Sequence, residues 1–200
     1  MQRGLFAMVL VVACATGAAA GLYDDAVSAF QRKDYTQAAR LFRPFAEQGD
    51  VLAQSSLGTM YKNGQGVTQD YGEALKWYRL AVAQGDALAQ SGLGTMYKNG
   101  QGVPQDYEEA VEWYRLAAAQ GDEDAQIGLG LIYGNAYSGV LDFVRAHMWF
   151  NLAATTLSGE ARKNAMKMRD TVASQLTAAQ IEEAQEMALR CQQSQFKKCD

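Results

Sequence analysis

The sequence predicts an all-α fold, a right-handed α-α superhelix (solenoid) of stacked helical hairpins with a C-terminal helical cap. Three observations lead to this prediction. Residues 50–85 match residues 86–121 at 29 of 36 positions, a third and more divergent copy follows at 122–157, and the apolar residues of each copy recur at helical spacing. A fixed period of roughly 20 to 50 residues is typical of repeat architectures, in which each unit buries its apolar face against its neighbours.

The first segment, residues 1–20, has the three parts of an export signal. Arg3 precedes an apolar run from Leu5 to Ala13, and small residues up to Ala20 provide a cleavage site. We therefore expect a mature protein that begins near Gly21 and is periplasmic or secreted. An alternative uses Cys14, because VVAC at 11–14 loosely resembles a lipoprotein processing box that would leave the chain lipid-anchored at this cysteine.

The next segment, residues 22–49, is predicted to form a hairpin of its own. Ala38, Phe42 and the KDY turn at 33–35 make it resemble a shorter unit of the tetratricopeptide type. The full-length repeats begin after it.

Each repeat is predicted to contain two helices, because turn and capping residues divide it twice. The tripeptide QGD, which ends one helix with a glycine and caps the next with an aspartate, recurs at 48–50, 84–86 and 120–122. In the first repeat, the first helix runs from Asp50 to the turn at Asn63-Gly64. Asp70 and Glu73 have the spacing of a capping box and begin the second helix.

Glycines and tryptophans hold equivalent positions in the three copies. Gly94 lies inside a predicted first helix, where glycine costs about 1 kcal/mol relative to alanine. Such a cost predicts that the second helix crosses there at close range, and Gly58 and Gly130 repeat the position. The tryptophans, which we expect in equivalent buried places, are Trp77, Trp113 and Trp149.

These residues resemble the Sel-one-like repeat, a relative of the tetratricopeptide repeat with a longer interhelical loop. The resemblance is to the exported bacterial type of this family. The pattern AQxxLGxMYxxGxGVxxDYxxAxxWYxxAAxQGD runs from Ala53 to Asp86 and again from Ala89 to Asp122. The third copy departs from it in its loop, GNAYSGVLDF, and in Phe150. The resemblance implies a non-catalytic scaffold whose first helices line a concave groove.

Aligning the repeats with tetratricopeptide units marks candidate residues for a partner-binding groove. They are Leu52, Ser55, Thr59, Lys62, Asn63, Leu88, Ser91, Thr95, Lys98, Asn99, Asp124, Ile127, Leu131 and Asn135. Lys62 and Lys98 would place positive charge in this groove and favour a partner that carries carboxylates. The alternative is that both lysines only complement the C-termini of their helices.

The C-terminal segment, residues 158–200, leaves the repeat and is predicted to cap the array with two helices. The second helix begins at Thr177 and has one apolar and one polar side, as a terminal unit requires. Cys191 and Cys199 are the only cysteines after the export signal, and an oxidising compartment favours a disulfide between them. An intermolecular disulfide is the alternative.

Composition argues against several kinds of function. Without residues 1–20 the chain has 17 basic and 22 acidic residues, a net charge of −5, which argues against nucleic acid as a partner. We expect no metal and no cofactor, because one histidine and two cysteines are too few for the usual sites. His147 has no nucleophile motif near it and is interpreted as structural, with general acid or base chemistry as the alternative.

The leading hypothesis is a non-catalytic, exported adaptor or scaffold of the bacterial cell envelope that binds a segment of a partner protein in its concave groove. The alternative is binding of an acidic polysaccharide or peptidoglycan. A third hypothesis is a β-lactam-binding enzyme, since a cysteine-rich branch of similar proteins has been linked to penicillin binding. It is disfavoured because that branch repeats its disulfides in each unit, whereas this chain has one terminal pair.

Overall fold

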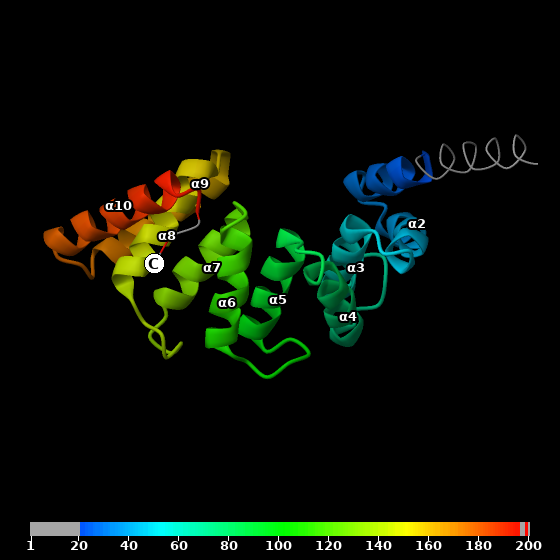
Figure 1. Cartoon of the computed structure of the whole chain (residues 1–200), viewed down its shortest axis with the longest axis horizontal. Helices are drawn as coiled ribbons and strands as arrows, with labels where there is room; N and C mark the ends of the chain where they lie inside the picture. The colour runs from blue at the N-terminus through cyan, green and yellow to red at the C-terminus, as the bar shows by residue number, and fades with distance from the viewer. Residues whose placement is uncertain (1–20, 197–198, 200) are drawn as a thin grey trace, which may run out of the picture. The chain divides into compact units, whose positions relative to one another are not determined.

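The computed structural model describes residues 21–196 and Cys199, and every regular element in this part of the chain is a helix (Figure 1). The prediction of an all-α repeat fold is thereby confirmed. The predicted export signal, including Cys14, lies outside the described residues. The chain divides into two compact units, one ending at Gln84 and one beginning at Gly85, and each is described by itself.

The first unit contains the short hairpin and the first full repeat. Its elements are a helix through residues 21–31, α2 (Tyr35–Glu47), α3 (Val51–Asn63) and α4 (Tyr71–Val82). Helix α3 packs against both α2 and α4. Phe42, Leu57, Met60 and Trp77 are buried in one cluster, so residues from three helices share a single core.

The second unit contains the other two repeats and the C-terminal helices. Its elements are α5 (Ala87–Asn99), α6 (Tyr107–Ala118), α7 (Glu123–Tyr133), α8 (Phe143–Thr156), α9 (Gly159–Ala173) and α10 (Ala178–Gln193). The helices of each repeat pack as pairs, α5 with α6 and α7 with α8, and α6 also packs on α7. Both α9 and α10 pack against α8, and α10 covers the end of the repeat pair as the apolar side of its sequence predicts.

The capping residues act as the QGD pattern predicts. Asp50, Asp86 and Asp122 each precede a first helix, and each side chain accepts the backbone N–H of the third residue after it at 2.7 Å. Such bonds satisfy one of the donors that a helix N-terminus leaves without a partner. A complete capping box, with both reciprocal bonds, is formed by Thr177 and Gln180 at the start of α10.

The glycines inside the first helices lie where an aromatic ring crosses. A Cβ atom at Gly94 would lie 2.7 Å from Cδ1 of Tyr114, and one at Gly130 would lie 2.6 Å from Cε1 of Phe150. These distances are too short for any side chain, which is the close approach that the glycine positions predict. Tyr114 also lies against Gly128 of α7, at 2.6 Å from the position of a Cβ atom there, so its ring is held between α5 and α7.

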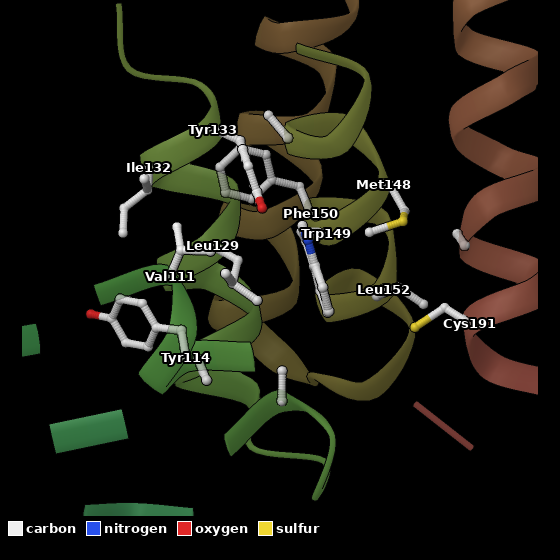
Figure 2. Close-up of a cluster of buried hydrophobic side chains, with 14 of the residues drawn as sticks. Val111, Tyr114, Leu129, Ile132, Tyr133, Met148, Trp149, Phe150, Leu152 and Cys191 are labelled. Carbon is white, nitrogen blue, oxygen red and sulfur yellow. The ribbon is translucent and has the colours of Figure 1, made fainter. Parts of the chain in front are cut away.

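Two of the three equivalent tryptophans are buried and the third is not. Trp77 belongs to the core of the first unit and Trp149 to that of the second (Figure 2). Trp113 is only partly buried, so the prediction of three equivalent buried places is wrong at this position. Its indole N–H donates to the Glu109 carboxylate at 2.9 Å, one turn earlier in α6, which gives the polar end of the ring a partner at a partly exposed position.

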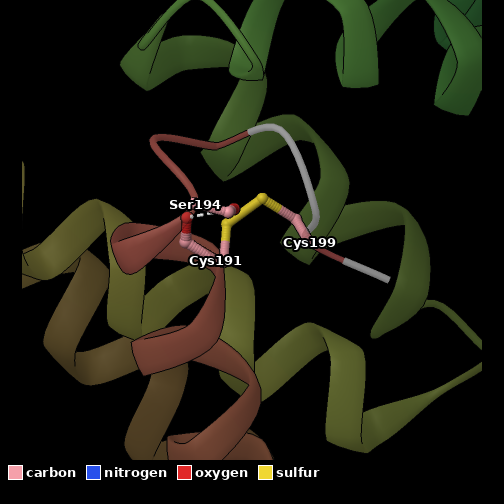
Figure 3. Close-up of a disulfide and its surroundings, with 3 residues drawn as sticks. All are labelled: Cys191, Ser194 and Cys199. Atoms are coloured by element: carbon pink, nitrogen blue, oxygen red, sulfur yellow. Dashed lines mark hydrogen bonds between the residues drawn. A yellow bond between two sulfur atoms is a disulfide. The ribbon is translucent and has the colours of Figure 1, made fainter.

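The C-terminal segment is tied to α10 by a disulfide. Cys191, fully buried at the end of α10, is bonded to Cys199 (Figure 3). The returning chain is held further by Phe196, whose backbone N–H donates to the carbonyl oxygen of Cys191 at 2.9 Å, and by the Ser194 hydroxyl, which donates to the same oxygen at 2.8 Å.

Candidate functional site

The predicted groove residues of the first unit have different environments. Leu52 is exposed over 60% of its surface and Asn63 is exposed, while Lys62 is half-buried. Ser55, by contrast, is fully buried, and its hydroxyl donates to backbone carbonyls of its own helix. Thr59 bonds to the Tyr78 hydroxyl at 3.0 Å. Ser55 is therefore closed to a partner, whereas Thr59 joins α3 to α4 and remains partly exposed.

The equivalent residues of the second unit make similar contacts. Ser91 is buried and hydrogen-bonds to the carboxylate of Asp122, the residue that caps α7. Thr95 bonds to the Tyr114 hydroxyl at 3.0 Å. Burial raises the pKa of Tyr114 to about 12, so this hydroxyl stays protonated and remains a structural contact. Ile127 is partly buried and packs against the core.

Four other predicted residues of the second unit meet at one recess. Lys98 and Asn99, at the end of α5, lie beside Leu131 and Asn135, at and after the end of α7. The recess has a volume of about 490 Å³, and its remaining lining is Gln105, Tyr107, Ile132 and Gly134. Leu88, at the other end of α5, is exposed over 46% of its surface.

Hydrogen bonds fix the polar wall of this recess. The Gln105 side chain donates to the Lys98 carbonyl oxygen at 2.8 Å and to the Tyr107 hydroxyl at 3.1 Å. Asn135 donates to the same hydroxyl at 3.4 Å. The loop between α5 and α6 is thereby joined to both first helices of the unit, and the recess is a preformed feature.

Lys98 is the charged group of the recess. Burial lowers the pKa of its ammonium group, and no aspartate or glutamate lines the recess. Across the described part of the chain, the ion pairs formed by lysine and arginine do not include Lys98. A partly desolvated charge without a counter-ion is a natural partner for an anionic ligand.

A second, larger recess of about 700 Å³ lies between α6 and the start of α8. Its two arginines already have partners. Arg115 donates to the Tyr133 hydroxyl at 3.0 Å and to the Glu112 carboxylate, and Arg145 pairs with Asp142 at 3.1 Å. The bond from Arg115 to Tyr133 joins α6 to α7, whereas the pair of Arg145 and Asp142 lies within the third repeat. Because both arginines already have partners, this recess is less available to an anionic ligand than the one at Lys98.

Two sets of repeated polar contacts were not anticipated from the sequence. Gln84 donates to the side-chain oxygen of Gln54 and to the Gly49 carbonyl, and Gln120 makes the same two bonds to Gln90 and Gly85. The interval of 30 residues between the glutamines, identical in both copies, is the signal that could have revealed the pair. The second set joins an arginine to a tyrosine 18 residues later, Arg43 to Tyr61 and Arg115 to Tyr133.

The histidine considered for general acid or base chemistry, His147, lies in α8. His147 is buried, and its pKa is lowered chiefly by burial and further by Arg169, which keeps the imidazole neutral. Within residues 21–196 and Cys199, no group of three or more histidine, cysteine, aspartate or glutamate side chains could hold a metal ion. The helices described here include none long and apolar enough to cross a membrane.

Comparison with known proteins identifies the repeat. The family model described as the Sel1 repeat matches residues 26–50, 51–86, 87–122 and 123–155. No functionally curated protein matches the sequence.

Two solved structures are similar to this chain. One is a protective antigen of uropathogenic Escherichia coli strains that displays an SLR fold, with 39% identity over 77% of this chain and 34% of the antigen, and a TM-score of 0.63. The other is a Sel1 repeat protein from Oxalobacter formigenes, with 37% identity over 63% of this chain and 95% of that protein, and a TM-score of 0.52. This chain thus spans about a third of the length of the E. coli antigen.

Proposed function

Because the chain belongs to the Sel1-repeat family, whose members are generally protein-interaction scaffolds and typically non-catalytic, we propose that it is an exported adaptor of the cell envelope. It binds an extended segment of a partner protein on the side of its first helices. The observation that carries this proposal is the recess at Lys98. This recess brings four predicted groove residues together, and its lining contains no carboxylate that would pair with the Lys98 ammonium group.

The contacts of two other predicted groove residues support the same interpretation. Ser91 and Thr95 lie in the middle of α5 and are used for contacts within the unit. The predicted residues of α5 that are available to a partner lie at the two ends of the helix. Leu88 lies at one end, and Lys98 and Asn99 lie at the other. An extended segment can contact both ends, because a helix of 13 residues is about 20 Å long.

Photocrosslinking tests the proposal with a matched pair of positions. Benzoylphenylalanine is introduced at Leu88 on α5 or at Leu116 on α6, which are exposed over 46% and 50% of their surfaces. After irradiation of intact cells, we expect a discrete protein adduct from position 88 and none from position 116. Equal adducts at both positions, or none at position 88, would contradict binding on the side of the first helices.

The second candidate function is binding of an acidic polysaccharide or peptidoglycan, since the Lys98 ammonium group would also suit a sugar carboxylate. Sedimentation with purified cell-wall material separates the two candidates. Retention in the pellet that is lost in a Lys62→Ala, Lys98→Ala double variant would favour the polysaccharide, and a chain that stays in the supernatant would favour the protein partner.

The non-catalytic part of the proposal has a direct test. We expect no covalent adduct when the mature chain is incubated with a labelled β-lactam, and formation of one would support the enzyme hypothesis instead. Intact mass of the protein purified from the envelope tests export, with Gly21 as the expected first residue and a lipidated Cys14 as the outcome that favours anchoring.

A further inference from the structure

The recess at the ends of α5 and α7 contains one cation and several amides. Its charged group is Lys98, its neutral polar groups are Asn99, Gln105 and Asn135 with the Tyr107 hydroxyl, and no carboxylate lines it. The chain as a whole is acidic. A positively charged recess of about 490 Å³ is therefore unusual in this acidic chain, and its charge requires a chemical explanation.

Lys98 is not needed to neutralise the end of its own helix. The last carbonyl oxygens of α5 are already occupied, because Met96 accepts the backbone N–H of Gln101 at 2.9 Å and Tyr97 accepts that of Asp106 at 3.0 Å. The carbonyl of Lys98 itself accepts the Gln105 side chain at 2.8 Å. The loop thus caps the helix with hydrogen bonds, and the ammonium group of Lys98 remains available to a ligand.

Burial of Lys98 also favours an incoming anion. Desolvation lowers the pKa of the ammonium group, and the lining of the recess provides no opposite charge. A carboxylate placed beside the ammonium group would compensate for part of the solvation that Lys98 loses by burial. The nearby amides of Asn99 and Asn135 would supply neutral hydrogen-bond donors to the same carboxylate.

Apolar neighbours indicate what carries the carboxylate. Leu131 lines the recess and is exposed over 41% of its surface, and Leu88 on α5 is exposed over 46%. Apolar side chains next to an acidic residue would cover these leucines, whereas a uronic acid chain presents hydroxyl groups on both sides of its carboxylate. The surface therefore fits a protein segment better than an acidic sugar.

From these contacts we infer that the α5–α7 recess receives the carboxylate of an aspartate or glutamate side chain of the bound protein segment, with Lys98 as its counter-charge. The inference rests on the proposed function and adds the chemistry of the partner.

Three small probes test it by NMR on the ¹⁵N-labelled mature chain. They are the acetylated and amidated tripeptides Leu-Glu-Leu and Leu-Gln-Leu, which differ by one charge, and tri-galacturonate. The side-chain amide signals of Asn99 and Asn135 report binding. We expect saturable shifts of these signals with the glutamate peptide, an affinity about tenfold above that of the glutamine peptide, and a preference that weakens as salt is added.

Variants of one lysine make the test specific. Lys98→Ala should remove the preference for the glutamate peptide, and Lys98→Arg should keep it, because the charge remains. The control is Lys163→Ala on α9, which removes the same charge from a lysine that pairs with Glu160 at 3.1 Å, and it should leave the preference unchanged. Equal binding of the two peptides, an unchanged preference in Lys98→Ala, or tighter binding of tri-galacturonate would overturn the inference.

Failure here is distinguishable from failure of the proposed function. A protein adduct at position 88 together with equal binding of the two peptides would overturn the carboxylate site and leave the adaptor standing. A charge preference at Lys98 without any protein adduct at position 88 would support the site and contradict the adaptor.

Discussion

An aromatic ring against a glycine is the contact that the repeats reproduce most faithfully. Tyr78 lies on Gly58, Tyr114 on Gly94 and Phe150 on Gly130, each joining the two helices of one repeat. Replacement of tyrosine by phenylalanine in the last copy keeps the ring and gives up the hydroxyl. The matching threonine is also absent there, since Leu131 stands where Thr59 and Thr95 stand in the earlier copies. The hydrogen bond and its partner are thus lost together.

Gly94→Val should therefore destabilise the second unit. The new side chain would overlap the Tyr114 ring, which cannot retreat because Gly128 of α7 lies against its other side. Overpacking of this kind costs about 1 to 3 kcal/mol, more than the helix propensity gained. Thermal unfolding should show a clear fall in melting temperature. Gly72→Ala is the control, since only the Asp70 carboxylate lies near its Cβ position, and an equal effect of both variants would contradict the close approach.

Asp122 makes the stability of the second unit depend on pH. Burial raises the pKa of its carboxyl above the ordinary value of 3.8, although Ser91 and the backbone of Ala125 offset part of this. Because the folded chain binds this proton more tightly than the unfolded chain, the stability contribution falls as pH rises through the raised pKa. Asp122→Asn keeps the helix cap and removes the charge, so it should be more stable than the parent at about pH 7.

Thermal melts of the parent and of Asp122→Asn at about pH 4 and about pH 7 check this prediction. The difference between the two proteins should shrink at the lower pH, where a larger fraction of Asp122 is protonated. A difference that grows on acidification would show that the sign is wrong.

Equivalent glutamines should respond in opposite directions to the same substitution. Gln126 is fully buried, and neither polar atom of its amide has a hydrogen-bond partner among the described residues. Gln90, at the same place in the previous repeat, accepts from Gln120 at 2.8 Å. Removing a buried polar group without a partner is favourable, whereas removing one member of a bonded pair leaves the other unsatisfied at a cost of about 1 to 3 kcal/mol.

Accordingly, Gln126→Leu should raise the melting temperature and Gln90→Leu should lower it. Both replace an amide by an apolar side chain of similar size on the first turns of a first helix. Loss of stability in both variants would show that Gln126 has a partner in solution.

At the scale of helices, the sequence predicted the beginning and end of most elements, because aspartate caps and glycine turns are local signals. It did not predict the burial of Ser55 and Ser91, nor the bonds of Thr59 and Thr95 to tyrosine hydroxyls. Periodicity places these residues on one side of a helix, but whether that side meets a partner or another helix depends on packing between helices, which local patterns do not contain. The recess at Lys98 was partly predicted, since the alignment named Lys98, Asn99, Leu131 and Asn135 without showing that they meet.

The disulfide of α10 should stabilise the C-terminal cap. It joins residues 8 apart, and Cys191 is part of the buried core beside Ala184 and Ala188. In the chain-entropy account, a loop of this length contributes about 2 to 3 kcal/mol. Reduction with dithiothreitol should lower the melting temperature while the helical circular dichroism of the folded chain is retained. A Cys191→Ala, Cys199→Ala double variant should not respond to the reductant, and an unchanged melt of the parent would contradict the stabilising role.

For the whole molecule, the period of 36 residues predicted the architecture, because each copy needs its neighbours to bury its apolar side. The division at Gln84 was not predicted, since the sequence runs through it with an almost unchanged repeat. We assign function to residues that the repeats do not use for stability. The capping, glycine and glutamine positions serve stability, and the recess at Lys98 provides surface chemistry beyond the needs of the fold.

Hydrogen exchange tests the central claim, that a partner binds on the side of the first helices, most directly. The full chain is compared alone and in the complex captured through position 88. The account predicts slower exchange in α5 and α7 and in the loop at Gln105 on complex formation, with α9 and α10 unchanged. Slower exchange confined to α6, α9 or α10 would contradict it.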